Sequence, residues 1–187
     1  MGHSQSEKAQ NRERILQAAA SQIREAGLES ISVAQLMRSV NLTHGGFYGH
    51  FESRAELLTL ALERALIDGS AASRAANAGQ ANPAAFIRGY LSRAHRDSRK
   101  NGCAVAALAS DVARADEPDR QVMERYIERL ITRVASALDA GDEEAMFATS
   151  AMVGGLLLSR VFTDAKRSDA MLKAVRNGLA AQSASEK

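Results

Sequence analysis

Residues 41–51, NLTHGGFYGHF, concentrate side chains and backbone positions that could do chemistry. They hold two of the four histidines, three of the eight aromatic residues and three glycines. His44 and His50 are possible metal ligands, but a spacing of six places them on different sides of a helix. The glycines lack both phosphate-loop patterns, G-x-G-x-x-G and G-x-x-x-x-G-K-[ST], and no strand precedes them. We therefore expect no metal and no cofactor here.

Cys103 is the single cysteine, so an internal disulfide is excluded and a reducing compartment is expected. It follows Arg99 and Lys100 at the start of a predicted helix, a setting that can make a thiol reactive toward oxidants or electrophiles. The alternative is a small buried core residue, which is the more common role of a free cysteine. The other histidines and the carboxylates are scattered, so the sequence predicts a protein that is not an enzyme.

The composition indicates helices throughout. Among 187 residues there are only two prolines, 45% are hydrophobic and 25% are charged, and the formal net charge is +2. No strand-like alternation occurs, so the expected fold is all-α. Ser32 with Gln35, Thr43, and Ser53 with Glu56 are predicted helix starts. The expected helices are 11–26, 32–40, 43–51, 53–66, 83–99, 103–114, 118–138, 142–163 and 168–182. The small, polar stretch 68–83 is a domain boundary or an alanine-rich extension of the preceding helix.

The segment around 41–51 fits two short helices joined by a sharp turn. Asn41 supplies the positive φ that such a turn needs, after glycine the best residue for it. Phe47 and Phe51 lie four residues apart and can anchor the second helix on one face. Thr43 and Tyr48 keep their hydroxyls free, and the glycines allow another backbone to approach. Such a helix start suits insertion into a DNA major groove.

The stretch ISVAQLMRSVNLTHGGFYGHFESRAELL (31–58), preceded by RERILQAAASQIREAG, resembles the DNA-binding domain of the TetR family of regulators. The resemblance covers about residues 12–60. It implies a helix-turn-helix domain over 1–54 and a helical effector-binding and dimerisation domain over 55–187. By position, Thr43, His44 and Gly45 fall where the family meets bases, and Tyr48, His50 and Arg54 fall where it grips the backbone. The full predicted set of DNA-binding residues is Ser32, Thr43, His44, Gly45, Gly46, Tyr48, His50 and Arg54.

This sequence departs from the family pattern at a few positions. Asn41 replaces the usual turn glycine, Gly49 stands where a polar or basic residue is common, and Arg54 replaces a common lysine. Residues 1–54 contain six Lys/Arg and five Asp/Glu, so bulk charge contributes little and DNA affinity should depend on direct contacts and dimerisation. Lys8, Arg12 and Arg14 form either a basic arm or a solvated helix face.

The resemblance implies a homodimeric repressor that a small-molecule effector releases from double-stranded operator DNA. The alternative is a small-molecule-binding helical protein whose DNA-binding head has lost function. The candidate effector-pocket residues, which fit an ordinary core equally well, are Phe86, Tyr90, Cys103, Met123, Tyr126 and Met152. The apolar segment 146–162, with small residues at 148, 151, 154 and 155, is expected to pair subunits together with 168–182; the alternative is the central helix of a single subunit's core. We found no secretory signal and no run long enough to span a membrane, so a cytoplasmic location is expected.

Overall fold

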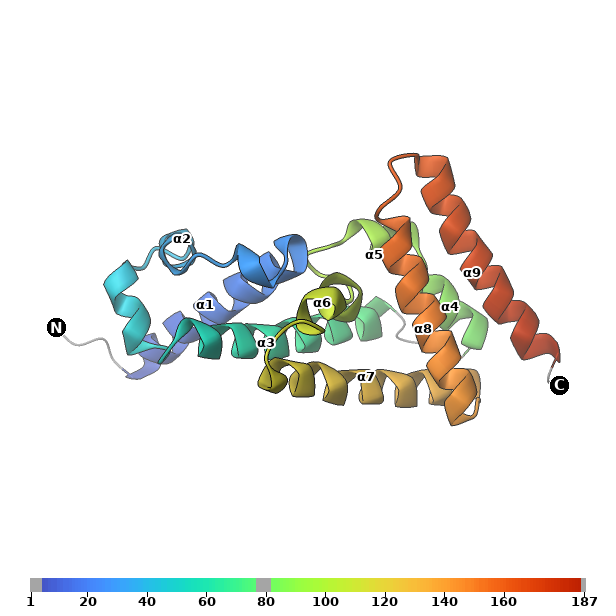
Figure 1. Ribbon diagram of the computed structural model, residues 1–187, viewed down its shortest axis with the longest axis horizontal. Coiled ribbons are helices and arrows are strands. Elements are labelled where there is room, and N and C mark those ends of the chain that lie inside the picture. The colour runs from blue at the N-terminus through green and yellow to red at the C-terminus, as the bar shows by residue number, and fades with distance from the viewer. Residues whose placement is uncertain (1–4, 77–81, 186–187) are drawn as a thin grey trace.

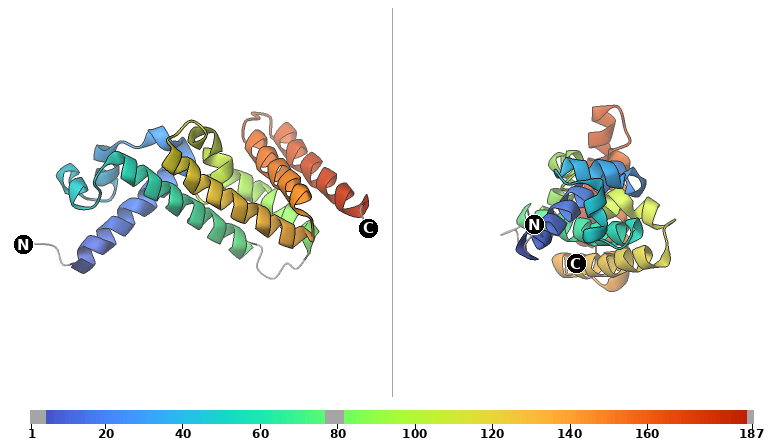
Figure 2. Two further views of the ribbon diagram at one scale, coloured as in Figure 1. Left: turned by 60° about the horizontal axis from the view of Figure 1, so that its bottom comes forward. Right: turned by 90° about the vertical axis from the view of Figure 1, so that its left-hand side faces the viewer.

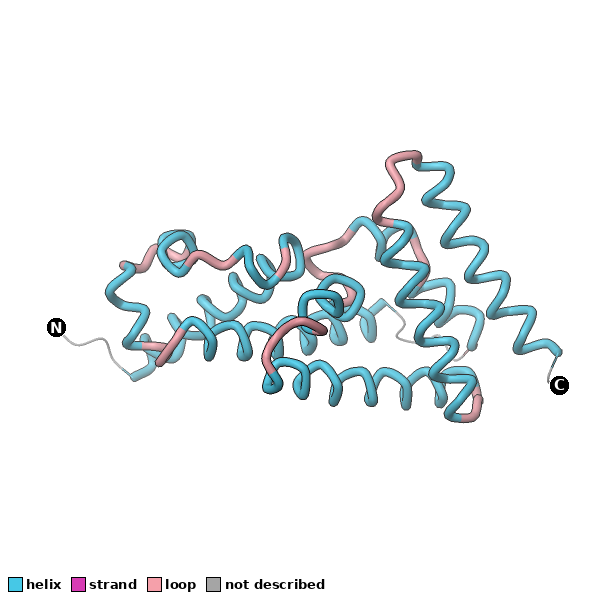
Figure 3. Tube along the Cα trace, in the orientation of Figure 1, coloured by secondary structure: helices cyan, strands magenta, loops and turns pink. Residues whose placement is uncertain are grey.

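The computed structural model describes residues 5–76 and 82–185, and this part of the chain consists of helices and loops without a strand (Figures 1 and 3). The all-α prediction is confirmed. The elements are α1 (Gln5–Ala26), the 3₁₀ helix η1 (Leu28–Ser30), α2 (Val33–Ser39), the 3₁₀ helix η2 (His44–Gly49), α3 (Arg54–Ala76), α4 (Pro83–Tyr90), α5 (Arg93–Asp97), α6 (Ala104–Val112), α7 (Glu117–Leu138), α8 (Asp142–Ser159) and α9 (Ala165–Ser185).

The molecule is elongated, with a head and a body. α1, α2 and η2 form the head at one end, and the hairpin of α8 and α9 forms the other end (Figures 1 and 2). α3 leaves the head and runs into the body beside α7, while α6 packs on α1, α3 and η1. The expected division at 54/55 falls at the start of α3. One cluster of buried apolar residues runs across it, from Ile15 in α1 to Leu179 in α9.

Helix α3 continues ten residues beyond the Leu66 end that we expected, through the alanines that follow. The alternative of an alanine-rich extension is therefore the correct one up to Ala76. Alanine has the highest helix propensity, so the absence of large apolar residues does not end the helix there. Residues 77–81 of the expected boundary lie outside the described part.

The predicted single helix 83–99 is wrong, because it is broken after Tyr90. Leu91 is fully buried with a non-helical backbone, and Ser92 caps a second helix by accepting a hydrogen bond from the His95 amide at 3.1 Å. A serine side chain competes with the helical backbone for such bonds.

The ends of the α8–α9 hairpin also differ from the prediction. α8 ends at Ser159 rather than at 163, and α9 starts at Ala165, where Asp164 accepts from the Lys166 amide at 2.8 Å. Ser168, the predicted start, lies inside α9 and donates to the Ser159 carbonyl at 2.6 Å.

Ser32 and Thr43 stand at the N-cap positions of α2 and η2, as predicted, but without the expected side-chain bonds. Ser53 does cap α3, because its hydroxyl accepts from the Glu56 amide at 3.0 Å.

Candidate DNA interface and effector cleft

The turn between α2 and η2 has the geometry that the sequence predicts. Asn41 adopts a φ of 58°, and the Leu42 amide donates to the Met37 carbonyl at 2.9 Å. Arg14 of α1 donates to the Val40 carbonyl at 2.6 Å, across 26 residues of sequence. The turn is therefore fixed at both sides, by its own backbone and by α1.

Helix η2 is anchored by Phe47 within it and by Phe51, two residues after its end. Phe47 and Phe51 are 1% and 2% exposed, and their rings lie 5.5 Å apart. The Arg12 guanidinium lies 5.1 Å from the centre of the Phe51 ring, a cation–π contact. Tyr48 packs its ring edge-on against Phe47 yet stays 72% exposed. The predicted anchors and the exposed hydroxyl are thus both present, on a 3₁₀ rather than an α-helix.

Packing inside the protein does not require glycine at positions 45 and 49 of η2. A methyl group at Gly45 or Gly49 would meet no atom within 4 Å. Positive φ does not require them either, because Gly27 is the positive-φ glycine among the described residues. Their backbone lies bare toward the outside, beside the exposed side chains of Thr43, His44 and Tyr48. These glycines would instead allow the surface of another molecule to approach the backbone of η2 closely.

Most basic side chains of the head are engaged in holding it together. Arg12 and Arg14 lie on α1 rather than in a separate arm; Arg12 pairs with Glu56, and Arg14, which stays exposed, donates to the turn. Arg54, predicted to grip the DNA backbone, donates to the Ile31 carbonyl at 3.2 Å and pairs with Glu29 at 3.3 Å.

Two exposed head cations remain, and within the described part of the chain neither Lys8 nor Arg38 forms an ion pair. Lys8 borders a hollow of about 350 Å³ beside η2. Its lining also includes Asn11, Met37, Leu42, Thr43, Gly46, Gly49 and His50. Ser32, at the start of α2, is exposed.

Polar contacts join α1 and η1 to the body, and a further one joins α3 to α7. Arg24 of α1 is only 5% exposed and donates to the carbonyls of Ala65 (3.1 Å) and Lys100. Burial lowers the pKa of Arg24, opposed by the nearby Asp68 carboxylate. The Leu28 amide donates to Asp111 at 3.1 Å, and the Thr59 hydroxyl to Asp119 at 2.6 Å.

Comparison with known proteins agrees with this geometry. The family model described as bacterial regulatory proteins, tetR family, matches residues 15–61, which include α2, the turn and η2. An uncharacterized HTH-type transcriptional regulator of Mycobacterium tuberculosis is 28% identical over 186 residues, covering 91% of this chain and 95% of that protein. This chain is a TetR-family transcriptional regulator.

Three solved structures, two of them TetR-family regulators, share the whole fold. A regulator from Cytophaga hutchinsonii superposes with a TM-score of 0.80 at 17% identity, covering 96% of this chain and 98% of that one. One from Agrobacterium tumefaciens gives 0.75 at 18% identity over 91% and 97%. The reduced form of E. coli NemR gives 0.74 at 18% identity over 91% and 95%. At these identities the likeness concerns the fold alone.

The TetR-type body buries most of the expected effector residues. Tyr90, Cys103, Met123, Tyr126 and Met152 are all below 9% exposed. Phe86 is partly buried and packs against the same core. Of these six, Tyr126 also lines a cleft of about 610 Å³ between α3 and α7. The effector assignment of the six residues stays a prediction.

Cys103 belongs to a buried polar cluster. The Tyr90 hydroxyl donates to its Sγ at 3.1 Å, and its amide donates to His95 Nε2 at 3.0 Å. Because Nε2 accepts, Nδ1 of the neutral ring carries the proton and donates to the Tyr90 carbonyl at 2.6 Å. Burial raises the pKa of Tyr90 well above its usual value and lowers that of His95. The burial of Cys103 agrees with the core interpretation rather than with an accessible sensor.

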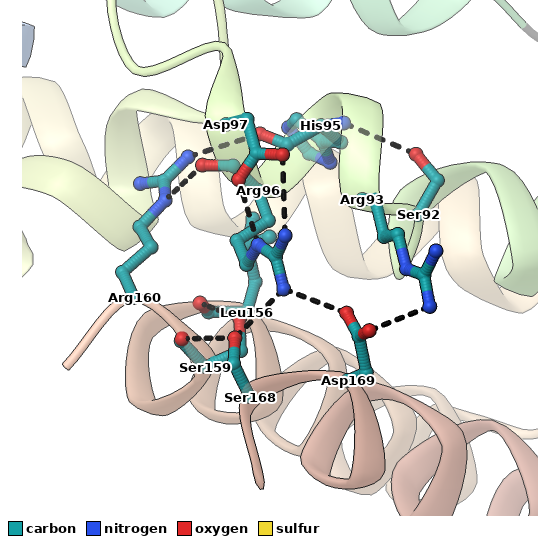
Figure 4. A network of polar contacts seen from close by, with 10 residues as sticks. All are labelled: Ser92, Arg93, His95, Arg96, Asp97, Leu156, Ser159, Arg160, Ser168 and Asp169. Carbon is teal, nitrogen blue, oxygen red and sulfur yellow. Dashed lines mark hydrogen bonds and ion pairs between the residues drawn. The ribbon is translucent and has the colours of Figure 1, made fainter. Parts of the chain in front are cut away.

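A second polar network ties α5 to the α8–α9 hairpin (Figure 4). Arg160 donates to the carbonyls of His95 (3.3 Å) and Arg96 (3.1 Å), at the end of α5. Arg96 in turn donates to Ser168 at 2.8 Å and to Asp169 at 2.9 Å. The loop after α5 contains Lys100, whose carbonyl accepts from Arg24. This network therefore fixes the start of that loop to the α8–α9 hairpin.

The outer face of α8 carries large apolar residues that this chain alone leaves uncovered. Phe147 and Leu158 are 54% and 50% exposed, and Val161, just after the end of α8, is 71% exposed. The expected small residues divide between two sides: Ala148 and Gly155 are buried, whereas Gly154 would meet nothing within 4 Å if it carried a methyl group. No helix in the described part of the chain is long and apolar enough to cross a membrane.

Proposed function

We propose that this TetR-family regulator acts in the cytoplasm as a homodimeric repressor that a small-molecule effector releases from its operator. The observation that carries the proposal is the bare outer surface of η2. The anchored helix and its N-cap expose Thr43, His44 and Tyr48 beside Gly45 and Gly49, two glycines that the protein interior does not require. A double helix in contact with this surface would supply the missing reason, with base edges near Thr43 and His44 and phosphates near Tyr48.

The uncovered face of α8 supports the dimer. Exposed large apolar residues on one helix face are typical of subunit interfaces, and Gly154 allows close approach of a second backbone. Two heads held in this way would present their recognition helices to successive major grooves of a pseudo-palindromic operator.

Release would follow from a change in the spacing of the two heads. α3 connects each head to the body, and Arg24 and Asp111 fasten the head to it at further points. An effector that prefers a body conformation with a different α3 position would shift the population away from the operator-binding state.

The test is fluorescence anisotropy of the purified protein on its own upstream DNA, with scrambled competitor and a salt series. Two unpaired head cations per protomer, Lys8 and Arg38, give about four phosphate contacts per dimer and a log–log salt slope of about −4. Tyr48→Phe, which keeps the ring on Phe47, should weaken binding about tenfold if the hydroxyl contacts a phosphate. Gln35→Ala, an exposed change on α2, is the matched control.

The repressor proposal would be refuted if scrambled DNA competes as well as the upstream DNA and a random-site selection enriches no sequence. This result would leave the alternative of a small-molecule-binding protein with a non-functional head.

A further inference from the structure

The cleft between α3 and α7 is built from one stripe on each helix. α3 contributes Glu63, Leu66 and Ile67, and α7 contributes residues at helical spacing from Val122 to Arg133. Its volume of about 610 Å³ is in the range of sites that hold small organic ligands. The Thr59–Asp119 hydrogen bond, at 2.6 Å, closes one end of the helix pair.

The floor of the cleft is apolar. Leu66, Val122 and Tyr126 line it and are 2%, 6% and 8% exposed, so each shows only a few atoms to the cleft. Ile67 also lines the cleft and is 61% exposed, so it carries most of the accessible apolar surface among these four residues. A hydrocarbon chain or ring in the cleft would remove this surface from water.

The rim of the cleft is cationic. Three arginines, at 125, 129 and 133, lie along α7, and Glu63 is the single carboxylate among the lining residues, which leaves a net charge of +2. Arg133 lies over the Tyr126 ring at 5.7 Å. Within the described residues, Arg125 and Arg129 form no ion pair, and Arg129 Nε donates only to the Arg125 carbonyl, at 3.0 Å. An arginine guanidinium matches a carboxylate in both charge and shape.

We propose that the α3–α7 cleft binds an amphipathic carboxylate, an acid with an apolar chain or ring, and that this compound is the effector. The apolar part would lie on Leu66, Val122 and Ile67, and the carboxylate would lie between Arg125 and Arg129. Glu63 disfavours compounds with several negative charges and so selects a single carboxylate.

The opposite side of the same turn of α3 holds the DNA-binding head. The carbonyl of Ala65 accepts from Arg24 of α1 at 3.1 Å, and Arg64 pairs with Glu13 of α1 and with Asp68 at 2.8 Å. Leu66 and Ile67 in the cleft directly follow these residues. A ligand that moves this turn therefore moves the residues that position α1, which connects the cleft to the head. This effector role rests on the proposed function, whereas carboxylate binding does not.

The binding test is isothermal titration calorimetry of the full-length protein with decanoate, decan-1-ol and decylamine, which share a chain and differ in charge. Decanoate should bind, the alcohol about tenfold more weakly and the protonated amine more weakly still. The Arg125→Ala/Arg129→Ala double variant should lose on the order of tenfold in decanoate affinity, because each exposed ion pair contributes up to about 1 kcal/mol. Arg120→Ala, on the same helix but outside the cleft lining, should bind decanoate like the wild type.

Equal affinity for the alcohol and the acid, or equal decanoate affinity in the double variant and the wild type, would overturn the proposal. So would binding of a protein partner in the cleft that decanoate does not displace. A carboxylate series from six to ten carbons should gain about threefold to fourfold per methylene, and a flat series would also overturn it.

The effector role is measured separately, by adding decanoate to the protein–operator complex. Release in the wild type but not in the double variant supports the effector role. Binding of decanoate without release would remove the effector role and keep the carboxylate site. Failure of the free protein to bind any operator would refute the proposed function, and the calorimetry would still decide the site.

Discussion

Alanine substitutions at Gly154 and Gly155 of α8 would show which face of this helix a second subunit covers. A methyl group at Gly155 would lie 2.8 Å from Cγ2 of Val175, 3.3 Å from its Cβ and 3.4 Å from its Cγ1. Rotating Val175 leaves its Cβ at 3.3 Å from the new methyl group, so α8 and α9 would have to move apart by a few tenths of an ångström. A methyl group at Gly154 meets nothing within 4 Å in the single chain.

The two Gly→Ala changes therefore differ in their expected energies. Each gains about 1 kcal/mol of helix propensity. At Gly155 the overpacking costs about 1–3 kcal/mol, so the free energy of unfolding should fall by about 0–2 kcal/mol. At Gly154 the isolated chain should be about 1 kcal/mol more stable. In a dimer packed on this face, the methyl groups at position 154 of the two subunits would push the helices apart, and the dimer dissociation constant should rise about tenfold or more.

Sedimentation velocity over a dilution series measures the dimer, and urea unfolding at two protein concentrations measures the stability. A Gly154→Ala protein that is both more stable and as tightly dimeric as the wild type would refute the placement of the interface on this face. A Gly155→Ala protein that is more stable than the wild type would refute the close α8–α9 packing.

Three further outcomes are expected. Gly49→Lys places a cation where the chain leaves open space, so operator affinity should rise and the salt slope should steepen by about 2 per dimer in the anisotropy assay; an unchanged slope would mean that this position does not face a phosphate. Arg24→Met should lower the free energy of unfolding by about 1–3 kcal/mol, because the buried carbonyls of Ala65 and Lys100 lose a donor; urea titration checks this, and full stability would show that the contact is dispensable. Because burial lowers the pKa of His95, the unfolded chain binds that proton more readily, so stability should fall as the pH drops below about 6.5; His95→Gln should flatten that part of the urea-midpoint curve, and an identical slope in both proteins would contradict the assignment.

Local patterns predicted the parts of the head that depend on neighbours in sequence. The positive φ of Asn41 and the burial of Phe47 and Phe51 follow from backbone sterics and helical spacing. The caps at Ser32 and Thr43 were predicted from residue type, but the bonding geometry is absent, and η2 is a tighter helix than expected.

Contacts between distant segments could not be predicted in this way. Arg54 has the residue type of a DNA-binding side chain, yet its partners Ile31 and Glu29 are 23 and 25 residues away and come close only after folding. The arginines of α7 are visible as a stripe in the sequence, but their role depends on α3 lying opposite. Met123 and Tyr126 show the same limit, because helical spacing is identical for a core residue and for a cleft-lining residue, and only tertiary packing separates them.

Because α3 is long, a small tilt of this helix in the body produces a larger displacement of the head at the DNA. Eleven residues separate Arg54 at the head from Ala65 beside the cleft, about 16 Å of helix at 1.5 Å per residue. Pivoting at Ala65, a tilt of about 10° would displace the head end by about 3 Å, and two subunits moving in opposite directions would change the separation of their recognition helices by about 6 Å. Successive major grooves on one face of DNA lie about 34 Å apart, so such a lever would carry the pair well out of register with its two half-sites.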